Sequence, residues 1–149
     1  MKRIAFFELE PWEKDHLKKK LQGFKLDFYD GTLEKKDWPK IRAADALVVF
    51  IYSPVPASIL GTAPKLKFVS TMSTGFDHVD VAGLKKKGVT VCNVPEYGSN
   101  TVAEHTFALL LSLSRFIPAS VERTKKGDFN LEGLRGWDLA GKTIGIIGT

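Results

Sequence analysis

The stretch ALVVFIY, residues 46–52, is an uninterrupted run of apolar side chains, several of them β-branched or aromatic. A run with no alternation of polar residues is typical of a strand that is covered on both faces, as in a parallel sheet. The sequence on either side should then supply neighbouring strands and the helices that cover them.

Shorter strand-like and helix-like segments alternate around this run. The predicted strands are residues 3–9, 25–29, 66–71 and 89–92, and the predicted helices are residues 12–21, 37–44, 58–61 and 81–87. Strands that alternate with short helices indicate βαβ units, a parallel sheet and right-handed crossovers. We therefore expect residues 1–100 to form a flavodoxin-like, doubly wound α/β domain with five parallel strands.

The sequence changes character after this segment. Residues 93–100 (NVPEYGSN) are rich in turn formers and contain the expected domain boundary, at residues 96–100. Residues 101–116 form the longest and most apolar predicted helix, with Asn100 as its N-cap and Glu104 near its positive end.

The remaining residues predict the start of a second domain. Pro118 should interrupt the long helix, and residues 119–126 should form a basic helix. Residues 142–147 (KTIGII) are expected to form a buried-type strand. We therefore predict that residues 101–149 are an interdomain helix and the beginning of an incomplete Rossmann domain.

Composition excludes several classes of protein. The chain has 149 residues, of which 44% are hydrophobic and 26% charged, and no apolar run is long enough to cross a membrane. The formal net charge of +5 arises from short lysine clusters on predicted helix faces or ends, which predicts neither a nucleic-acid nor a membrane surface. The single cysteine and an N-terminus without a signal pattern favour the cytoplasm.

The loop TMSTGFDHVD, residues 71–80, follows a predicted strand, where open parallel sheets bind their ligands. Gly75 would let backbone N–H groups come close to an anion, so the amides of Thr74 and Gly75 could hold a carboxylate. The alternative is an ordinary turn in which Asp77 and Asp80 cap the next helix.

Other candidate residues have equally ordinary alternatives. Tyr97 could offer its hydroxyl to a ligand or pack on its loop, and Phe50 could shape a pocket or belong to the core. Acid–base chemistry would fall to His16, His78 or His105. We expect a surface position for His16 and a structural hydrogen bond for His105. His78 could orient a substrate, but solvent exposure and helix capping in its loop explain it as well. Cys92 is expected to be an inert buried thiol, and no spacing indicates a metal site.

Three segments together resemble the D-isomer-specific 2-hydroxyacid dehydrogenase family. They are STGFDHVD (73–80), NVPEYGSNTVAEHTFALLLSLSR (93–115) and DLAGKTIGIIGT (138–149). The tyrosine in NVPEY resembles the D-lactate dehydrogenase branch. The resemblance runs through essentially the whole chain but covers only the first half of a family member.

This resemblance implies roles for individual residues. Thr74 and Gly75 would bind the substrate carboxylate through their amides, Tyr97 and Phe50 would line the substrate pocket, and Thr74 would also lie near the nicotinamide of NAD. The cofactor-binding positions further along the chain are Val102 and Gly148, the latter as the first pyrophosphate-loop glycine. The family transfers hydride between nicotinamide and carbon 2 of a small 2-hydroxy or 2-oxo acid.

The resemblance also implies what this chain does not contain. The catalytic Arg, Glu and His of the family lie beyond residue 149, and none of the three histidines matches the catalytic one. We therefore expect the chain alone to be inactive. There are two alternatives. The first is an interaction module that forms homodimers through residues 101–116 or by exchange of the terminal strand. The second is a small-carboxylate sensor without redox chemistry.

Overall fold

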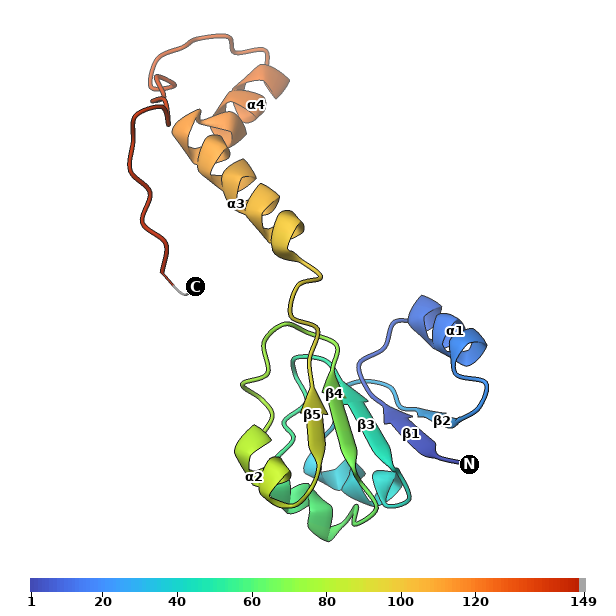
Figure 1. The fold of residues 1–149 in the computed structure, drawn as a ribbon. Helices are drawn as coiled ribbons and strands as arrows, with labels where there is room; N and C mark the ends of the chain where they lie inside the picture. The colour runs from blue at the N-terminus through green and yellow to red at the C-terminus, as the bar shows by residue number, and fades with distance from the viewer. Residues whose placement is uncertain (148–149) are drawn as a thin grey trace. The chain divides into compact units, whose positions relative to one another are not determined.

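The computed structural model describes residues 1–147 and contains a parallel sheet in the order β2-β1-β3-β4-β5 (Figure 1). Its strands are β1 (Arg3–Phe6), β2 (Lys25–Phe28), β3 (Ala46–Val49), β4 (Phe68–Thr71) and β5 (Thr90–Cys92). All four neighbouring pairs are parallel. The predicted flavodoxin-like sheet is confirmed, because this order is that of the flavodoxin type of doubly wound fold.

The central strand is shorter than its apolar sequence predicts. Residues 46–52 are apolar throughout, yet β3 ends at Val49. The N–H groups of Phe50 and Tyr52 donate to the Glu8 carboxylate instead of to a neighbouring strand. A polar side chain shortly after β1 thus takes the N–H groups that would continue the pairing of β3.

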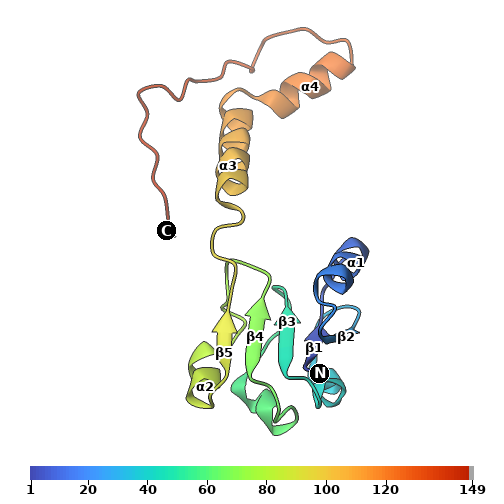
Figure 2. The ribbon, with the colours of Figure 1, turned by 45° about the vertical axis from the view of Figure 1, so that its right-hand side comes forward.

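Helices cover the two faces of the sheet differently (Figure 2). The helix α1 (Pro11–Lys20) lies over the face that carries Phe6 and Phe28, where Lys18 Nζ is 5.8 Å from the Phe28 ring. The 3₁₀ helices η1 (Lys35–Ile41) and η2 (Ala57–Gly61) and the helix α2 (Val81–Lys86) contribute their buried residues to the opposite face.

The core lies between that second face and the three short helices. The strands and the residues at their ends contribute fully buried apolar side chains from one face of the sheet. The helices and loops contribute the other buried side chains of the core. The largest members of the core are Phe7, Leu33, Ile41, Leu47, Val49, Val55, Ile59, Leu66, Val69 and Leu84. Burying a side chain of this size contributes about 1.5–3 kcal/mol to stability, so this cluster is what holds the sheet and the short helices together.

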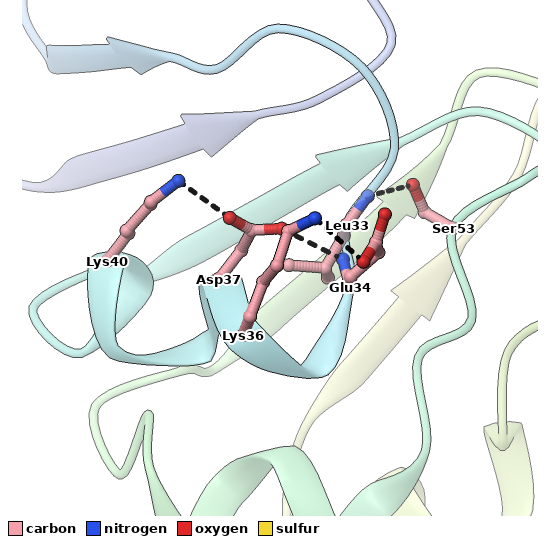
Figure 3. A network of polar contacts seen from close by, with 6 residues as sticks. All are labelled: Leu33, Glu34, Lys36, Asp37, Lys40 and Ser53. Carbon is pink, nitrogen blue, oxygen red and sulfur yellow. Dashed lines mark hydrogen bonds and ion pairs between the residues drawn. The ribbon is translucent and has the colours of Figure 1, made fainter.

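Polar contacts order the start of η1 and tie it to the segment after β3 (Figure 3). The buried carboxylate of Asp37 accepts hydrogen bonds from the Glu34 N–H at 3.2 Å and from Lys40 Nζ at 2.6 Å. Just before the helix, the Leu33 N–H donates to the Ser53 hydroxyl at 2.8 Å. The bonds from the Glu34 and Leu33 N–H groups satisfy backbone donors at the start of the helix that would otherwise lack partners.

The chain divides into two compact units, Met1–Tyr97 and Gly98–Thr149. The second unit contains α3 (Ser99–Ser114) and α4 (Ile117–Lys125). Gly98 precedes α3 and its carbonyl accepts the Val102 N–H at 2.8 Å, so Asn100 lies inside the first turn and is not the N-cap we predicted.

The break between the two helices lies at Phe116, whose backbone adopts a left-handed conformation with φ of 52°. Pro118 belongs to the first turn of α4 and does not itself interrupt a helix. A proline is tolerated there because the first N–H groups of a helix have no intrahelical acceptor.

The predicted strand over residues 142–147 is wrong for the described chain. These residues form no strand pairing, and Ile144, Ile146 and Ile147 are 55%, 73% and 101% exposed. An apolar sequence becomes a strand only where a neighbour accepts and donates its backbone hydrogen bonds. None of the helices within residues 1–147 is both long and apolar enough to span a membrane.

Candidate functional site

The predicted substrate residues follow strands of the same parallel sheet and therefore belong to its carboxyl edge. Phe50 follows β3, Thr74 and Gly75 follow β4, and Tyr97 lies in the segment after β5. Phe50 is half-buried, while Tyr97 is 63% exposed. Open α/β sheets bind ligands at this edge, so the sheet positions these loops where a site belongs.

The loop after β4 is held through its carbonyl oxygens. The Asn93 side-chain amide donates to the Thr74 carbonyl at 2.8 Å, and the Ser73 hydroxyl donates to the Gly75 carbonyl at 2.7 Å. The Val94 N–H donates to the Ser73 carbonyl at 3.1 Å. The Thr74 hydroxyl in turn donates to the Val94 carbonyl at 3.2 Å, so the loops after β4 and β5 are tied to each other.

The amides of the same loop are free. Within residues 1–147, neither the Thr74 N–H nor the Gly75 N–H donates to a protein acceptor, and both residues are exposed. A loop whose carbonyls are engaged and whose adjacent N–H groups are not carries a local positive potential. Such an arrangement can bind a carboxylate.

Gly75 leaves open space in front of these amides. A Cβ atom placed on it would meet only the Asp77 carboxylate, at 3.9 Å, and its φ is not in the left-handed region. The fold itself therefore does not require glycine at this position. The absence of a Cβ would matter where a ligand approaches the backbone closely.

Glu8 is a site residue that the sequence reasoning missed. Its carboxylate accepts hydrogen bonds from the Phe50 N–H at 3.1 Å, from the Tyr52 N–H at 2.9 Å and from the Ser53 hydroxyl. We call these four residues the Glu8 cluster. An acidic residue directly after an apolar strand (RIAFFEL) was the available signal, but the predicted strand extended over it to residue 9.

We call the segment of residues 73–75, which contains the Thr74 and Gly75 N–H groups, the carboxylate loop. Two buried hydroxyls lie between the Glu8 cluster and this loop. Thr71 Oγ1 is 3.3 Å from the Phe50 carbonyl and contacts the Ser73 hydroxyl, which reaches the Gly75 carbonyl. Both side chains are buried. The two hydroxyls have one proton each, yet together they make three contacts: to the Phe50 carbonyl, to each other and to the Gly75 carbonyl. This network couples the segments after β3 and β4.

The remaining candidates are dispersed. His16 and His105 are exposed, and the structural hydrogen bond expected for His105 is not formed by its side chain within the described residues. His78 is half-buried, and its Nε2 is shielded from solvent without a partner in that part of the chain, while its carbonyl accepts the Val55 N–H at 2.9 Å. Asp80 caps α2 by accepting the Gly83 N–H at 2.9 Å.

Cys92 contradicts our expectation of a buried thiol, since it is exposed. It lies on the edge strand β5 in register with Ser70, on the sheet face opposite the core. Period-two alternation therefore turns its side chain away from the buried cluster. Among residues 1–147 no group of three or more His, Cys, Asp or Glu side chains could hold a metal ion.

The cofactor positions are not assembled in the described chain. Val102 lies in the first turns of α3 and is 65% exposed, and Gly148 lies outside the described residues. Residues 142–147 form no strand that could lead into a pyrophosphate-binding turn. The part of the chain that the structure describes therefore does not fit a complete dinucleotide site.

The first unit is thus an open α/β domain with an exposed loop at the carboxyl edge of its sheet, in which the Thr74 and Gly75 N–H groups have no acceptor among residues 1–147. Residues 4–132 match the family described as D-isomer specific 2-hydroxyacid dehydrogenase, catalytic domain. The chain belongs to the D-isomer-specific 2-hydroxyacid dehydrogenase family, as its motifs predicted.

Similar proteins agree with this assignment. The chain is 40% identical to 2-hydroxyacid dehydrogenase homolog 1 of Schizosaccharomyces pombe and 31% identical to D-lactate dehydrogenase of Escherichia coli, in each case over 99% of this chain and 46% of the relative. A D-lactate dehydrogenase structure from Aquifex aeolicus, complexed with NAD and lactic acid, superposes with a TM-score of 0.85 at 30% identity, covering 91% of this chain and 41% of that one. The chain therefore spans just under half the length of these relatives.

Proposed function

We propose that this chain carries the substrate-binding domain of an NAD-dependent D-2-hydroxyacid dehydrogenase that acts on a small acid such as D-lactate. Family membership supports the oxidoreductase class. The similarity to D-lactate dehydrogenases, one of them in complex with NAD and lactic acid, supports the choice of substrate and cofactor. The whole activity would require the catalytic residues that the family supplies outside these 149 residues.

The free N–H groups of Thr74 and Gly75 carry this proposal. Substrate carboxylate would accept hydrogen bonds from both amides, which the loop presents without needing to break an existing bond. Phe50 would face the substrate side chain, and the Tyr97 hydroxyl would reach a substrate oxygen. Binding the carboxylate in this way orients carbon 2 for the reaction.

The cofactor part of the proposal rests on the family alone. Thr74 would contribute from the loop after β4, Val102 from α3 and Gly148 from the segment after residue 147. When bound, the nicotinamide supplies or accepts the hydride. Since a complete dinucleotide site is not formed by the described residues, we expect the 149-residue chain neither to bind NAD tightly nor to oxidise NADH in the presence of pyruvate. We propose that the dehydrogenase to which this domain belongs works in the cytoplasm.

Pyruvate titration of the ¹⁵N-labelled chain tests the carboxylate site. We expect saturable shifts of the Thr74 and Gly75 amide resonances, because these N–H groups would change acceptor. Gly75→Ala should weaken binding by about tenfold, a loss of about 1.4 kcal/mol. Its unfolding temperature should stay the same, because a Cβ at this position has room in the fold.

Gly61→Ala is the matched control. A Cβ at Gly61 meets no atom within 4 Å, and the residue ends η2 away from the carboxylate loop. Its affinity for pyruvate should equal that of the unsubstituted chain. Absence of saturable shifts, or equal affinity in the Gly75→Ala and Gly61→Ala variants, would overturn the carboxylate site.

Self-association is a second proposed property, favoured by the surface of α3. Its exposed apolar side chains are Val102, Phe107, Leu109, Leu111 and Leu113. A helix with so many exposed apolar groups gains free energy by burying them against a second copy. Sedimentation velocity should show a homodimer that Leu109→Lys converts to monomer, whereas a monomer at high concentration would contradict the proposal.

A further inference from the structure

Glu8 has an unusual backbone conformation for its residue type. Its φ is +61°, in the left-handed region that non-glycine residues rarely occupy. The Glu8 N–H donates to the Gly31 carbonyl at 3.0 Å, and the chain leaves β1 at this point. A residue is kept in such a conformation only where surrounding contacts outweigh the backbone cost.

The contacts that do so are made by the Glu8 carboxylate. Oε2 accepts the Phe50 N–H and the Ser53 hydroxyl, and Oε1 accepts the Tyr52 N–H. Ser53 is itself fixed, because its hydroxyl accepts the Leu33 N–H at 2.8 Å (Figure 3). The segment after β3 therefore takes its path from the side chain of Glu8, two residues after the end of β1, rather than from pairing with a strand.

These bonds require a carboxylate in particular. Three donors point at two oxygens, and both oxygens are used as acceptors. An amide of the same shape has one acceptor oxygen and one NH₂ group, which cannot accept. Replacing Glu8 by glutamine would thus leave at least one backbone N–H facing another donor.

We propose that Glu8 is a positioning residue for substrate specificity: it fixes Phe50 against the substrate side chain without touching the substrate. This inference rests on the proposed function, in which Thr74 and Gly75 bind the carboxylate and Phe50 lines the side-chain pocket. The carboxylate loop is held by its own bonds to Asn93 and Ser73. Loss of the Glu8 cluster should therefore disturb the side-chain pocket more than the carboxylate site.

Two 2-oxo acids separate these effects. Glyoxylate has a carboxylate and no carbon side chain, whereas 2-oxobutyrate adds an ethyl group that must pack against Phe50. Titrations of the 149-residue chain, followed by the Thr74 and Gly75 amide resonances, give both dissociation constants. We expect Glu8→Gln to weaken 2-oxobutyrate binding at least fivefold and glyoxylate binding less than twofold. A general loss of stability would not change this ratio.

Asp45→Asn is the matched control for a lost inter-strand carboxylate. Asp45 lies at the opposite edge of the sheet, just before β3, and accepts hydrogen bonds from the Arg3 N–H and Lys2 Nζ, both at 2.9 Å. It bridges β1 and the start of β3 as Glu8 bridges β1 and the end of β3. Asp45→Asn should leave the affinity ratio of the two acids unchanged.

The outcomes are distinct. An unchanged ratio in folded Glu8→Gln overturns the inference while leaving the proposed function intact. Absence of saturable shifts with either acid in the unsubstituted chain contradicts the proposed function, and the inference with it. If Glu8→Gln does not fold, Ser53→Ala provides the test, because it removes one donor to Glu8 and the acceptor for Leu33. A twofold or larger change in its ratio supports the inference, and no change overturns it.

Discussion

The two units of the chain differ in what their apolar residues contact. All of the buried apolar side chains belong to Met1–Tyr97, whereas Ser114 is the one buried residue among the described residues from 98 onward. The short helix α2 buries Leu84, while the much longer α3 buries no apolar side chain. Apolar content alone therefore does not produce a core. The sheet provides the surface against which even a short helix is stable.

The largest expected consequence of this difference is in amide hydrogen exchange. Amides of β3 and β4 should exchange only through global unfolding, while those of α3 should exchange through local opening of a helix that lacks a buried face. We expect protection to differ by at least about 10³-fold, which corresponds to a difference of about 4 kcal/mol in the free energy of opening.

Exchange measured by NMR at two protein concentrations checks this expectation. Equal protection of α3 and β3 at low concentration would contradict the comparison of the two units. Protection of α3 that rises with concentration would instead support the proposed homodimer, because a second copy would then cover its apolar side chains.

Substitution of one leucine in each unit sharpens the comparison. Leu47→Ala removes a fully buried side chain from β3 and should lower the free energy of unfolding by about 2–5 kcal/mol. Leu113→Ala, in a side chain that is 72% exposed, should change it by less than about 0.5 kcal/mol. Urea unfolding followed by circular dichroism measures both. Similar losses in the two variants would show that α3 is packed in solution.

Glycine positions provide a smaller effect of the same kind. A Cβ on Gly83 would lie 2.2 Å from the Asp80 carboxylate that caps α2, and a Cβ on Gly136 would lie 2.2 Å from the Ser114 carbonyl. Both alanine variants clash, but only Gly83 belongs to the unit with the core. Gly83→Ala should lower the free energy of the main unfolding transition by about 1–3 kcal/mol. Gly136→Ala should leave that transition unchanged in the same urea experiment, and an equal loss would contradict the confinement of the apolar core to the first unit.

The difference between the two units also explains which parts of the fold could be predicted from the sequence. The apolar run at residues 46–52 and the alternation around it were sufficient to predict the parallel sheet, because strand period and helix period are local properties. The equally apolar KTIGII segment was assigned as a strand by the same reasoning, yet it has no neighbour to pair with among the described residues. Pairing is a tertiary property that a local pattern does not contain.

The candidate site divides in a similar way. Thr74 and Gly75 could be predicted, since a glycine in a turn after a strand has a local signature. Glu8 could not, because its three donors come from residues 42–45 positions away in the chain. Cys92 was misassigned because a strand sequence does not say which of its two faces the core covers.

Acid titration gives the smallest expected effect and distinguishes a structured carboxylate from a surface one. The hydrogen bond from Lys40, and after it the bond from the Glu34 N–H, lowers the pKa of Asp37 below its ordinary value of 3.8. A carboxyl whose pKa is lowered by folding stabilises the protein above its unfolded pKa, and this contribution is lost as the pH falls through the folded pKa. Asp37→Asn should therefore lower the unfolding temperature at pH 6, and the difference from the unsubstituted chain should shrink below about pH 4.

Asp138→Asn is the counterpart in the second unit. Asp138 pairs with Arg115 at 3.4 Å, and both side chains are more than half exposed. Exposed pairs of this kind contribute little to stability, so the unfolding temperature should not change at either pH. If Asp37→Asn lowers the unfolding temperature equally at both pH values, the loss does not come from the charge of Asp37. It would then come from packing and hydrogen bonds that the amide does not replace. A pH-dependent loss in Asp138→Asn would instead mean that the second unit contributes to the cooperative transition, against the division of packing between the two units.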